Sequence, residues 1–342
     1  MKYNLEESKT EVIITDNLID SVKIEEKKVF IIDSKVYKLH KKLILEVTEK
    51  YPIYIYNASE RNKTLPEAEK ILQFLFDNKV NRSTIVTSIG GGITTDITAY
   101  AASVFKRGCG LQLIPTTFLA MIDAAIGGKT AVNFNGVKNT IGTFYPAEKV
   151  YVYPEFLQTL TKKQLNNGWA ECIKTTLIQT SGLQKKIVEK FPEITKDILK
   201  ETINIKMRIC EKDLSDKGDR RKLNLGHTFA HIIETASDNA VSHGEAVLLG
   251  LISALKLSLQ KNMISEDDFV RMQEILGLMS VEFEKIAQYK QVITDQFDYL
   301  LMHDKKANEN VNLILFRGFC ETVIQEEKDK ELILKVLLEN LL

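Results

Sequence analysis

The sequence predicts an α/β first half and a mostly α-helical second half, with the active site in the cleft between them. In the first half, short apolar and β-branched runs alternate with segments of helical spacing, which is typical of parallel strands covered by helices. From about residue 164 onward, long helical stretches follow one another with few strand signals. A chain of 342 residues is long enough for about two domains. We therefore expect a Rossmann-like domain at residues 1–163 and an α-helical domain at residues 164–342.

The individual elements follow from the same patterns. Apolar and β-branched runs predict strands at residues 28–33, 54–56, 84–89 and 111–114. Helical spacing in the first half predicts helices at residues 66–77 and 97–105. In the second half it predicts helices within residues 182–211, 245–261 and 266–276, and an amphipathic terminal helix at residues 329–338.

Composition and charge exclude several classes of protein. The 46 basic residues balance 46 acidic ones, so no overall field attracts nucleic acid or an anionic membrane. The N-terminal residues contain no apolar signal core, and no stretch reaches the roughly 18 apolar residues that a membrane span needs. We therefore expect a soluble cytoplasmic protein that binds neither nucleic acid nor a membrane.

The cysteines predict neither a disulfide framework nor a structural zinc knuckle. Cys109, Cys172, Cys210 and Cys320 lie far apart and form no Cys-x-x-Cys pair. Cys172 follows Glu171 directly, so it could be mistaken for a metal ligand or a nucleophile. Because adjacent residues on a helix face different directions, we expect Cys172 to serve in packing.

A glycine triplet at residues 90–92 predicts a nucleotide site. It follows a strand and opens a helix, where backbone N–H groups and the helix N-terminus can approach a pyrophosphate. The alternative is an ordinary tight turn, since the spacing is not Gly-x-Gly-x-x-Gly. Asp33 ends an earlier strand and could bond ribose hydroxyls, which would favour NAD. The alternative for Asp33 is a turn residue at a strand end, because it precedes the glycines instead of following them.

Lys129 lies in a segment suited to a phosphorylated ligand. Two glycines precede Lys129 and let its ammonium reach an oxyanion, while Lys138 and Asn139 add further donors. The segment is not a P-loop, because Asp123 stands where that motif requires its first glycine. We therefore exclude an ATPase of that type.

Clustered histidines predict a metal site. His227, His231 and His243 are three of the five histidines and fall within seventeen residues. Residues four apart share a helical face, so His227 and His231 can point into one cavity, and a break at residues 237–239 lets His243 return to it. Two histidines and a carboxylate are the ligands of catalytic zinc, and Glu171 is a natural third ligand. The alternatives are histidines clustered by chance, and a solvated ion pair between Glu171 and Lys174.

These motifs, taken in order, resemble the dehydroquinate synthase family of sugar-phosphate cyclases. The matching segments are residues 90–92 with 96, 106–108, 115–117, 123–130, 138–139, 170–174, 224–231, 243–245 and 304–306. Alanines at 124, 125 and 230 depart from the family's Ser-Ser and Gly, and Lys35 departs from a frequent Asn. The resemblance implies conversion of the seven-carbon phosphate DAHP to 3-dehydroquinate and phosphate in the shikimate pathway. It implies transient NAD oxidation, phosphate elimination, re-reduction and intramolecular aldol closure.

The resemblance also implies roles for individual residues. Glu171, His227 and His243 would be ligands of Zn²⁺ or Co²⁺, and His231 would contact substrate and transfer protons. The remaining substrate contacts would be Lys129, Asn139, Lys174, Lys206, Arg220, Asn224 and one of Lys305 or Lys306. Asp123 would bridge the substrate and cofactor sites, and Arg107 would reach phosphate in the neighbouring subunit of a homodimer. The NAD contacts would be Asp33, Glu60, Lys63, Gly91, Gly92, Ile93, Asp96, Thr116, Thr117, Asp123, Lys129, Lys138 and Asn139.

Three other functions are compatible with parts of this pattern. Related cyclases make inososes or valiolones, but Lys129 with its neighbours and His231 favour dehydroquinate. An oxidoreductase resembling glycerol dehydrogenase would share the two halves and release the reduced cofactor. A regulatory phosphosugar-binding protein would have no need of His231 and of both ends of a hydride path.

Overall fold

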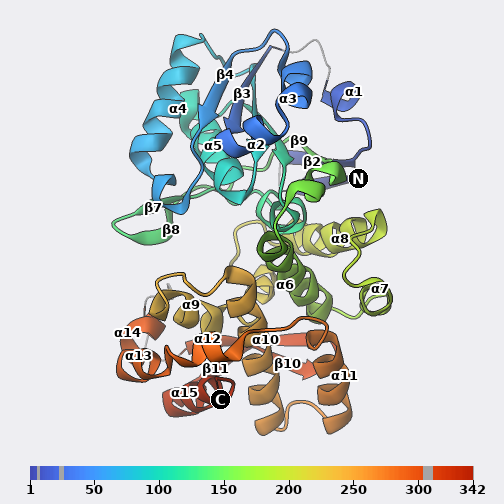
Figure 1. Cartoon of the computed structure of the whole chain (residues 1–342), viewed down its shortest axis with the longest axis vertical. Coiled ribbons are helices and arrows are strands. Elements are labelled where there is room, and N and C mark those ends of the chain that lie inside the picture. Colours follow the sequence, from blue (N-terminus) through green and yellow to red (C-terminus); the bar gives the residue numbers. More distant parts are fainter. Residues whose placement is uncertain (6–7, 23–26, 303–310, 342) are drawn as a thin grey trace. The chain divides into compact units, whose positions relative to one another are not determined.

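The computed structural model describes residues 1–5, 8–22, 27–302 and 311–341 (Figure 1). The chain forms two compact units. The first comprises Met1–Leu165 and Lys206–Ser215, and the second comprises Asn166–Ile205 and Asp216–Leu342. Within the described residues, none of the helices combines the length and the apolar character required to cross a membrane.

A seven-stranded sheet forms the centre of the first unit, in the order β1-β2-β9-β6-β5-β3-β4. The strands are β1 (Lys2–Leu5), β2 (Ser8–Ile14), β3 (Lys28–Asp33), β4 (Ile53–Tyr56), β5 (Ile85–Gly90), β6 (Gly110–Pro115) and β9 (Lys149–Val152). Only β1 and β2 pair antiparallel, and all other neighbours are parallel. The four predicted strands are confirmed as β3, β4, β5 and β6. The other three were not predicted.

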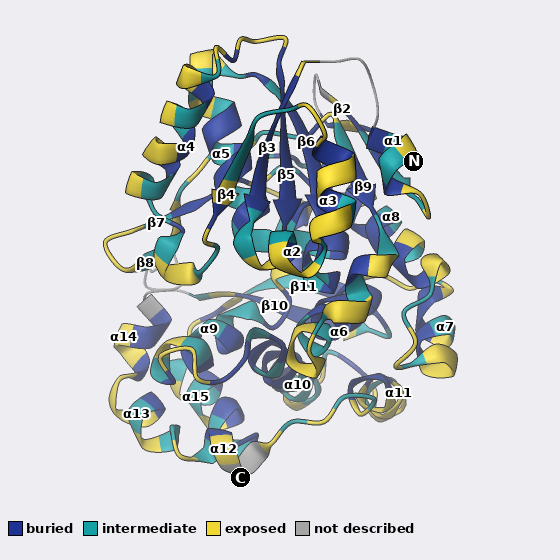
Figure 2. Ribbon diagram, turned by 45° about the horizontal axis from the view of Figure 1, so that its top comes forward, coloured by how far each residue is buried: buried dark blue, intermediate teal, exposed yellow. Residues whose placement is uncertain are grey.

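Burial along the central strands explains their sequence. Every residue of β5 is buried, as are all but the last of β3, and both strands are dark blue in Figure 2. Strands covered on both faces read as continuous apolar runs without alternation, which is the pattern that predicted them.

Helices and a hairpin complete the first unit. They are α1 (Leu18–Val22), α2 (Ser34–Leu39), α3 (Lys41–Thr48), α4 (Leu65–Asp77), α5 (Gly92–Val104), the short helices η1 (Glu60–Asn62), η2 (Phe105–Arg107), η3 (Ala120–Ala124) and η4 (Pro154–Thr159), and the strands β7 (Val132–Phe134) and β8 (Val137–Ile141). The helix predicted at residues 66–77 is confirmed as α4. The helix predicted at residues 97–105 begins earlier, at Gly92, so the glycine turn leads directly into α5.

The second unit is mostly helical, as predicted. Its elements are α6 (Lys162–Ile178), α7 (Leu183–Lys190), α8 (Lys196–Lys212), η5 (Asp219–Asn224), α9 (His227–Ala236), α10 (His243–Gln260), α11 (Glu266–Leu276), α12 (Phe283–Ala287), α13 (Lys290–Asp295), α14 (Phe297–Met302), α15 (Lys330–Glu339) and the strands β10 (Val311–Gly318) and β11 (Glu321–Glu327). The first residues of α6 and the last of α8 belong to the first unit.

Two features of the second half differ from the prediction. The stretch predicted as helical at residues 182–211 contains two helices, α7 and α8, and Pro192 lies between them. Proline has no N–H for the helical hydrogen-bond pattern, which accounts for a break there. The antiparallel hairpin of β10 and β11 was not predicted. The buried run at residues 313–316 lacks the alternation that identifies a half-exposed strand.

Two glycines allow α9 and α10 to pack closely. A Cβ atom added at Gly250, on α10, would overlap the carbonyl oxygen of Gly226. Gly226 caps α9 with a φ of +76°, a left-handed conformation that favours glycine. This contact holds the first residue of α9 against α10, and that residue is His227.

Candidate metal centre and nucleotide site

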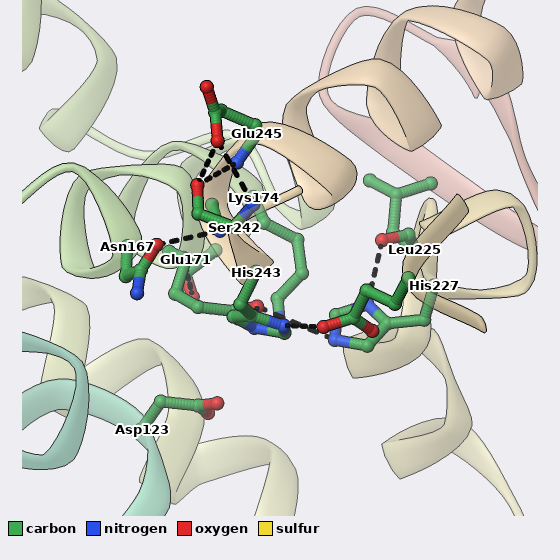
Figure 3. Close-up of polar contacts among 12 residues, drawn as sticks. Asp123, Asn167, Glu171, Lys174, Leu225, His227, Ser242, His243 and Glu245 are labelled. Carbon is green, nitrogen blue, oxygen red and sulfur yellow. Dashed lines mark hydrogen bonds and ion pairs between the residues drawn. The ribbon is translucent and has the colours of Figure 1, made fainter. Parts of the chain in front are cut away.

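Three helices of the second unit bring the predicted metal ligands together (Figure 3). Glu171 lies in the middle of α6, while His227 and His243 are the first residues of α9 and α10. Nε2 of His243 lies 3.1 Å and Nε2 of His227 lies 3.4 Å from Oε1 of Glu171. One ligand atom from each of the three residues lies within 4.8 Å of the others. The predicted ligand set therefore converges in the structure.

The opposite ring nitrogens of both histidines face hydrogen-bond partners. Nδ1 of His227 lies 3.2 Å from the carbonyl oxygen of Leu225. Nδ1 of His243 lies 3.2 Å from Oε1 of Glu234, a residue of α9. Partners of this kind fix the tautomer of a ligating histidine and leave Nε2 available to a metal. The residues present therefore fit a divalent transition metal.

Local charges keep Glu171 in the form that binds a metal. Its side chain is fully buried, which opposes ionisation, but the ammonium of Lys174 and the imidazole of His227 hold its pKa well below the usual value. Lys174 forms a buried ion pair with Oε2 of Glu171. The alternative of a solvated pair is therefore wrong, because both side chains are almost inaccessible to water.

The two histidines differ in charge preference. Burial, with the nearby ammonium of Lys174, lowers the pKa of His227, which favours the neutral form of its ring. Burial opposes the charged form of His243 as well, but the carboxylates of Glu171 and Glu234 raise its pKa to about 10. A buried site with two carboxylates thus attracts positive charge, which a divalent cation would supply.

His231 lies next to the cluster and is not part of it. Its ring centroid is 5.6 Å from that of His227, and the two rings meet edge to face at 86°. The three-residue cluster contains His243 and Glu171 but not His231. Helical spacing therefore predicted that His227 and His231 lie near each other on α9, but it did not predict that only His227 of the two joins the metal cluster.

The other predicted substrate residues occupy both units. In the second unit, Arg220 is buried on η5 and Asn224 ends the same short helix with an exposed side chain. In the first unit, Lys206 forms an ion pair with Asp123 and donates a hydrogen bond of 2.7 Å to the carbonyl oxygen of Asp123. Lys129 in the first unit is exposed.

Arg107, Lys305 and Lys306 complete the set of predicted substrate residues. Arg107 is exposed and has a φ of +64° at the end of η2. Lys305 and Lys306 lie outside the described residues.

The glycine turn is closely packed by the segment of the first unit that runs from Thr116 to the end of η3. Gly91 caps α5, and a Cβ atom there would lie 3.1 Å from Cγ2 of Thr117. A Cβ atom at Gly92 would lie 3.1 Å from Cβ of Ala124, and the backbone N–H of Thr116 donates to the carbonyl of Gly90. Ile93 follows in the first turn of α5. The turn thus places backbone N–H groups at a helix N-terminus, the arrangement that binds phosphate.

A lysine joins three segments predicted to contact NAD. Lys63, which is only 4% exposed, forms an ion pair of 2.5 Å with Asp96 on α5. It also donates a hydrogen bond of 2.6 Å to Oδ1 of Asn139 on β8. Burial raises the pKa of Asp96, and the nearby Lys63 opposes that rise. Glu60 lies beside Lys63 and accepts a hydrogen bond of 2.8 Å from Asn133.

The remaining predicted NAD contacts are an aspartate and a lysine. Asp33 accepts a hydrogen bond of 2.8 Å from the backbone N–H of Lys35 and caps α2. This contact agrees with the alternative that Asp33 is a turn residue at a strand end. Lys138 lies exposed on β8, next to Asn139.

Sequence reasoning missed three residues that support these sites. Glu234 contacts His243, Asn133 joins Glu60 to the hairpin, and Oδ1 of Asn167 accepts a hydrogen bond of 2.9 Å from the N–H of Gly244. None belongs to a recognisable motif. Their roles follow only from their partners, which lie 9, 73 and 77 residues away along the chain.

Cys172 is a packing residue, as predicted. It is fully buried, and its Sγ lies 3.3 Å from Oγ1 of Thr202. Burial raises the pKa of its thiol to about 12, so it is neither a nucleophile nor a thiolate ligand at neutral pH.

Comparison with known proteins identifies the family. Two models match the chain in succession, described as 3-dehydroquinate synthase N-terminal over residues 53–167 and 3-dehydroquinate synthase C-terminal over residues 168–307. The 3-dehydroquinate synthase of Clostridium tetani is 34% identical over 91% of this chain and 85% of its own length. That of Campylobacter curvus is 33% identical over 99% of each chain. The chain belongs to the 3-dehydroquinate synthase family.

Two solved structures have the same fold as this member of the 3-dehydroquinate synthase family. A 2-deoxy-scyllo-inosose synthase, solved with carbaglucose-6-phosphate, NAD⁺ and Co²⁺, has a TM-score of 0.82 at 24% identity over 99% of each chain. A 2-epi-5-epi-valiolone synthase from Streptomyces hygroscopicus, solved with NAD⁺ and Zn²⁺, has a TM-score of 0.81 at 24% identity over 98% of each chain. At this identity the likeness concerns the fold alone. The cluster of Glu171, His227 and His243 falls within the segment matched by the C-terminal model of the 3-dehydroquinate synthase family.

Proposed function

We propose that this chain converts DAHP to 3-dehydroquinate and inorganic phosphate, in the shikimate pathway of the cytoplasm. Membership of the 3-dehydroquinate synthase family over nearly the whole chain supports the reaction. The single structural observation that carries the proposal is the convergence of Glu171, His227 and His243 within 4.8 Å. These are the ligand types that bind a catalytic zinc or cobalt ion.

The proposed cofactors are NAD and either Zn²⁺ or Co²⁺. A divalent cation would act as a Lewis acid toward substrate hydroxyls, and NAD would supply a hydride acceptor that is regenerated. Glu171, His227 and His243 would hold the cation. The glycine turn and the group of Lys63, Asp96 and Asn139 support NAD binding by the first unit, and we assign this role to the domain expected at residues 1–163.

We assign the remaining site residues as contacts of the substrate and of NAD. His231 would exchange a proton at a ring nitrogen, one helical turn from His227. Positive charge on Arg220 and the lysines would stabilise the departing phosphate by a few kcal/mol per group in a water-excluded site. The assigned substrate residues are Arg107, Asp123, Lys129, Asn139, Lys174, Lys206, Arg220, Asn224 and one of Lys305 or Lys306. The assigned NAD residues are Asp33, Glu60, Lys63, Gly91, Gly92, Ile93, Asp96, Thr116, Thr117, Asp123, Lys129, Lys138 and Asn139.

A homodimer is part of the proposal. Arg107 would serve the neighbouring subunit, and its exposed position on η2 is compatible with a contact to another chain. Light scattering after size-exclusion chromatography measures the mass in solution. A mass of one chain, unchanged by NAD and metal, would contradict this part.

A phosphate-release assay tests the proposed reaction. DAHP is incubated with the protein, with and without NAD and with and without a metal chelator, while phosphate and NADH are followed together. We expect phosphate release that requires both NAD and metal, with no net NADH. Absence of phosphate release from the NAD- and metal-loaded protein would overturn the proposal. Steady accumulation of NADH would instead assign an oxidoreductase of the glycerol-dehydrogenase type.

A further inference from the structure

We propose that Glu234 is a positioning residue of the metal centre, which fixes the orientation and tautomer of His243 and thereby sets the affinity for a divalent metal. The inference rests on the proposed function, because it takes Glu171, His227 and His243 as the ligands. Glu234 lies outside the motifs found in the sequence, and its contact with His243 is at Nδ1, the ring nitrogen opposite the one proposed to bind the metal.

The geometry places His243 between two carboxylates. Oε1 of Glu234 lies 3.2 Å from Nδ1 of the ring, and Oε1 of Glu171 lies 3.1 Å from Nε2 on the opposite side. The side chain of Glu234 is 13% exposed, so little water competes for the contact. A carboxylate at Nδ1 keeps a proton on that nitrogen, which leaves the lone pair of Nε2 for the metal.

The two histidines of the cluster are oriented in different ways. The partner of Nδ1 in His227 is the backbone carbonyl of Leu225, two residues away on the same segment. The partner in His243 is a side chain nine residues earlier, on another helix. A hydrogen bond to a charged carboxylate is stronger than one to a neutral carbonyl. Glu234 is therefore the part of this arrangement that a substitution can remove.

The start of α10 is held independently of Glu234. Ser242 and Glu245 form a capping box, and Asn167 of α6 accepts a hydrogen bond from the N–H of Gly244. Figure 3 shows the contacts of Ser242, Glu245 and Asn167 above His243. Replacing Glu234 should therefore release the ring without releasing the helix that carries it. This separates positioning from a general structural role.

Metal affinity measured by competition with a chelator tests the inference. Zinc is titrated against a chromophoric chelator in the wild-type protein, Glu234→Ala and Glu234→Gln, with Glu274→Ala as a control on an exposed position of α11. Removal of an outer partner of a metal ligand weakens affinity about 10- to 100-fold. We expect a loss in that range for Glu234→Ala and a smaller one for Glu234→Gln, whose amide oxygen can still accept from Nδ1.

A second measurement separates positioning from folding. The thermal midpoint should fall less in the metal-free protein than in the zinc-loaded protein for both variants, so that the rise in midpoint on adding zinc shrinks. If Glu234→Ala fails to fold, Glu234→Gln carries the test. Unchanged zinc affinity, or metal-free midpoints that fall as far as the zinc-loaded ones, would overturn the inference. If the wild-type protein binds zinc and the Glu234 variants bind it equally well, this inference alone is refuted. If the wild-type protein binds no zinc, the proposed metal centre is refuted as well.

Discussion

Lys174 and Glu171 form a buried ion pair one helical turn apart on α6. The carboxylate of Glu171 also contacts the two histidines of the metal cluster. Lys174 therefore supplies positive charge to Glu171, and a bound metal cation would do the same. Breaking a buried pair leaves an uncompensated charge, whereas an alternative cation can take over the role of the lost partner.

Lys174→Met should therefore destabilise the metal-free protein more than the metal-loaded one. We expect a loss of about 3 kcal/mol in the free energy of unfolding without metal, and a clearly smaller loss with zinc bound. Urea denaturation with and without zinc measures both values. Lys185→Met is the control, because Lys185 and Glu189 form an exposed pair at 3.8 Å. Equal losses in the two conditions would show that the charge of Lys174 and that of the metal are not interchangeable.

Gly250→Ala should separate the helices that carry the two histidine ligands. The added methyl group would collide with the backbone of Gly226, directly before His227. We expect a loss of about 1–3 kcal/mol in stability, as for other overpacked cores, together with weaker zinc binding. Calorimetry with zinc and thermal unfolding measure the two effects. Gly182→Ala is the control, since nothing lies within 4 Å of a Cβ atom there, and equal behaviour of the variants would contradict the close packing.

Lys63→Met should weaken NAD binding without affecting the metal centre. The substitution removes the ammonium that joins Asp96 to Asn139. The half-buried carboxylate of Asp96 then has lost the counter-charge of Lys63. We expect micromolar binding of NAD by the wild-type protein and an increase of about tenfold or more in the dissociation constant of the variant. Calorimetry with NAD measures this. The control is Lys70→Met, which removes an exposed pair with Glu67 on α4. A variant with wild-type NAD affinity would remove Lys63 from the site.

Glu327→Gln should reduce stability at neutral pH but not in acid. Burial alone would raise the pKa of Glu327, but the hydrogen bond from Lys261 and those from the N–H groups of Lys328 and Asp329 lower it. A carboxylate whose folded pKa lies below its unfolded value of about 4.3 stabilises the fold above that value, and the contribution disappears as pH falls through the folded pKa. We expect a loss of about 1 kcal/mol at pH 7.

Urea denaturation at pH 7 and at about pH 3 checks this dependence. The difference between the wild-type protein and Glu327→Gln should shrink toward zero at the lower pH, and Glu274→Gln should change little at either. A difference that persists in acid would mean that Glu327 stabilises the fold by packing and not by its charge.

Sequence alone predicted the elements with strong local patterns. The apolar runs of β3 and β5 and the helical spacing of α4 and α11 are continuous signals, and the structure has these elements close to the predicted bounds. The four-residue β9 is too short to show a period, and β10 lacks alternation because its centre is buried. The assignment of β9 depends on its pairing with β2 and β6, which lie much earlier in the chain, and that of β10 depends on its pairing with β11.

In the candidate site, too, some residues could be predicted from the sequence and others could not. Spacing and residue type predicted a metal site among the clustered histidines and Glu171, and the family resemblance selected Glu171, His227 and His243 as the ligands. The structure brings these three together. The roles of Glu234 and Asn133 could not be predicted, because each depends on a partner that only the folded chain places nearby. The close packing of α9 against α10 could not be predicted either, because a glycine in a helical sequence does not indicate which residue will pack against it.

Metal analysis of the purified protein tests the central claim most directly. Zinc and cobalt are measured by elemental analysis in the wild-type protein and in His243→Ala, with folding checked by circular dichroism. We predict about one equivalent of metal per wild-type chain and a concerted loss of metal and turnover in His243→Ala. A folded His243→Ala protein that retains its full metal content would contradict the assignment of the centre.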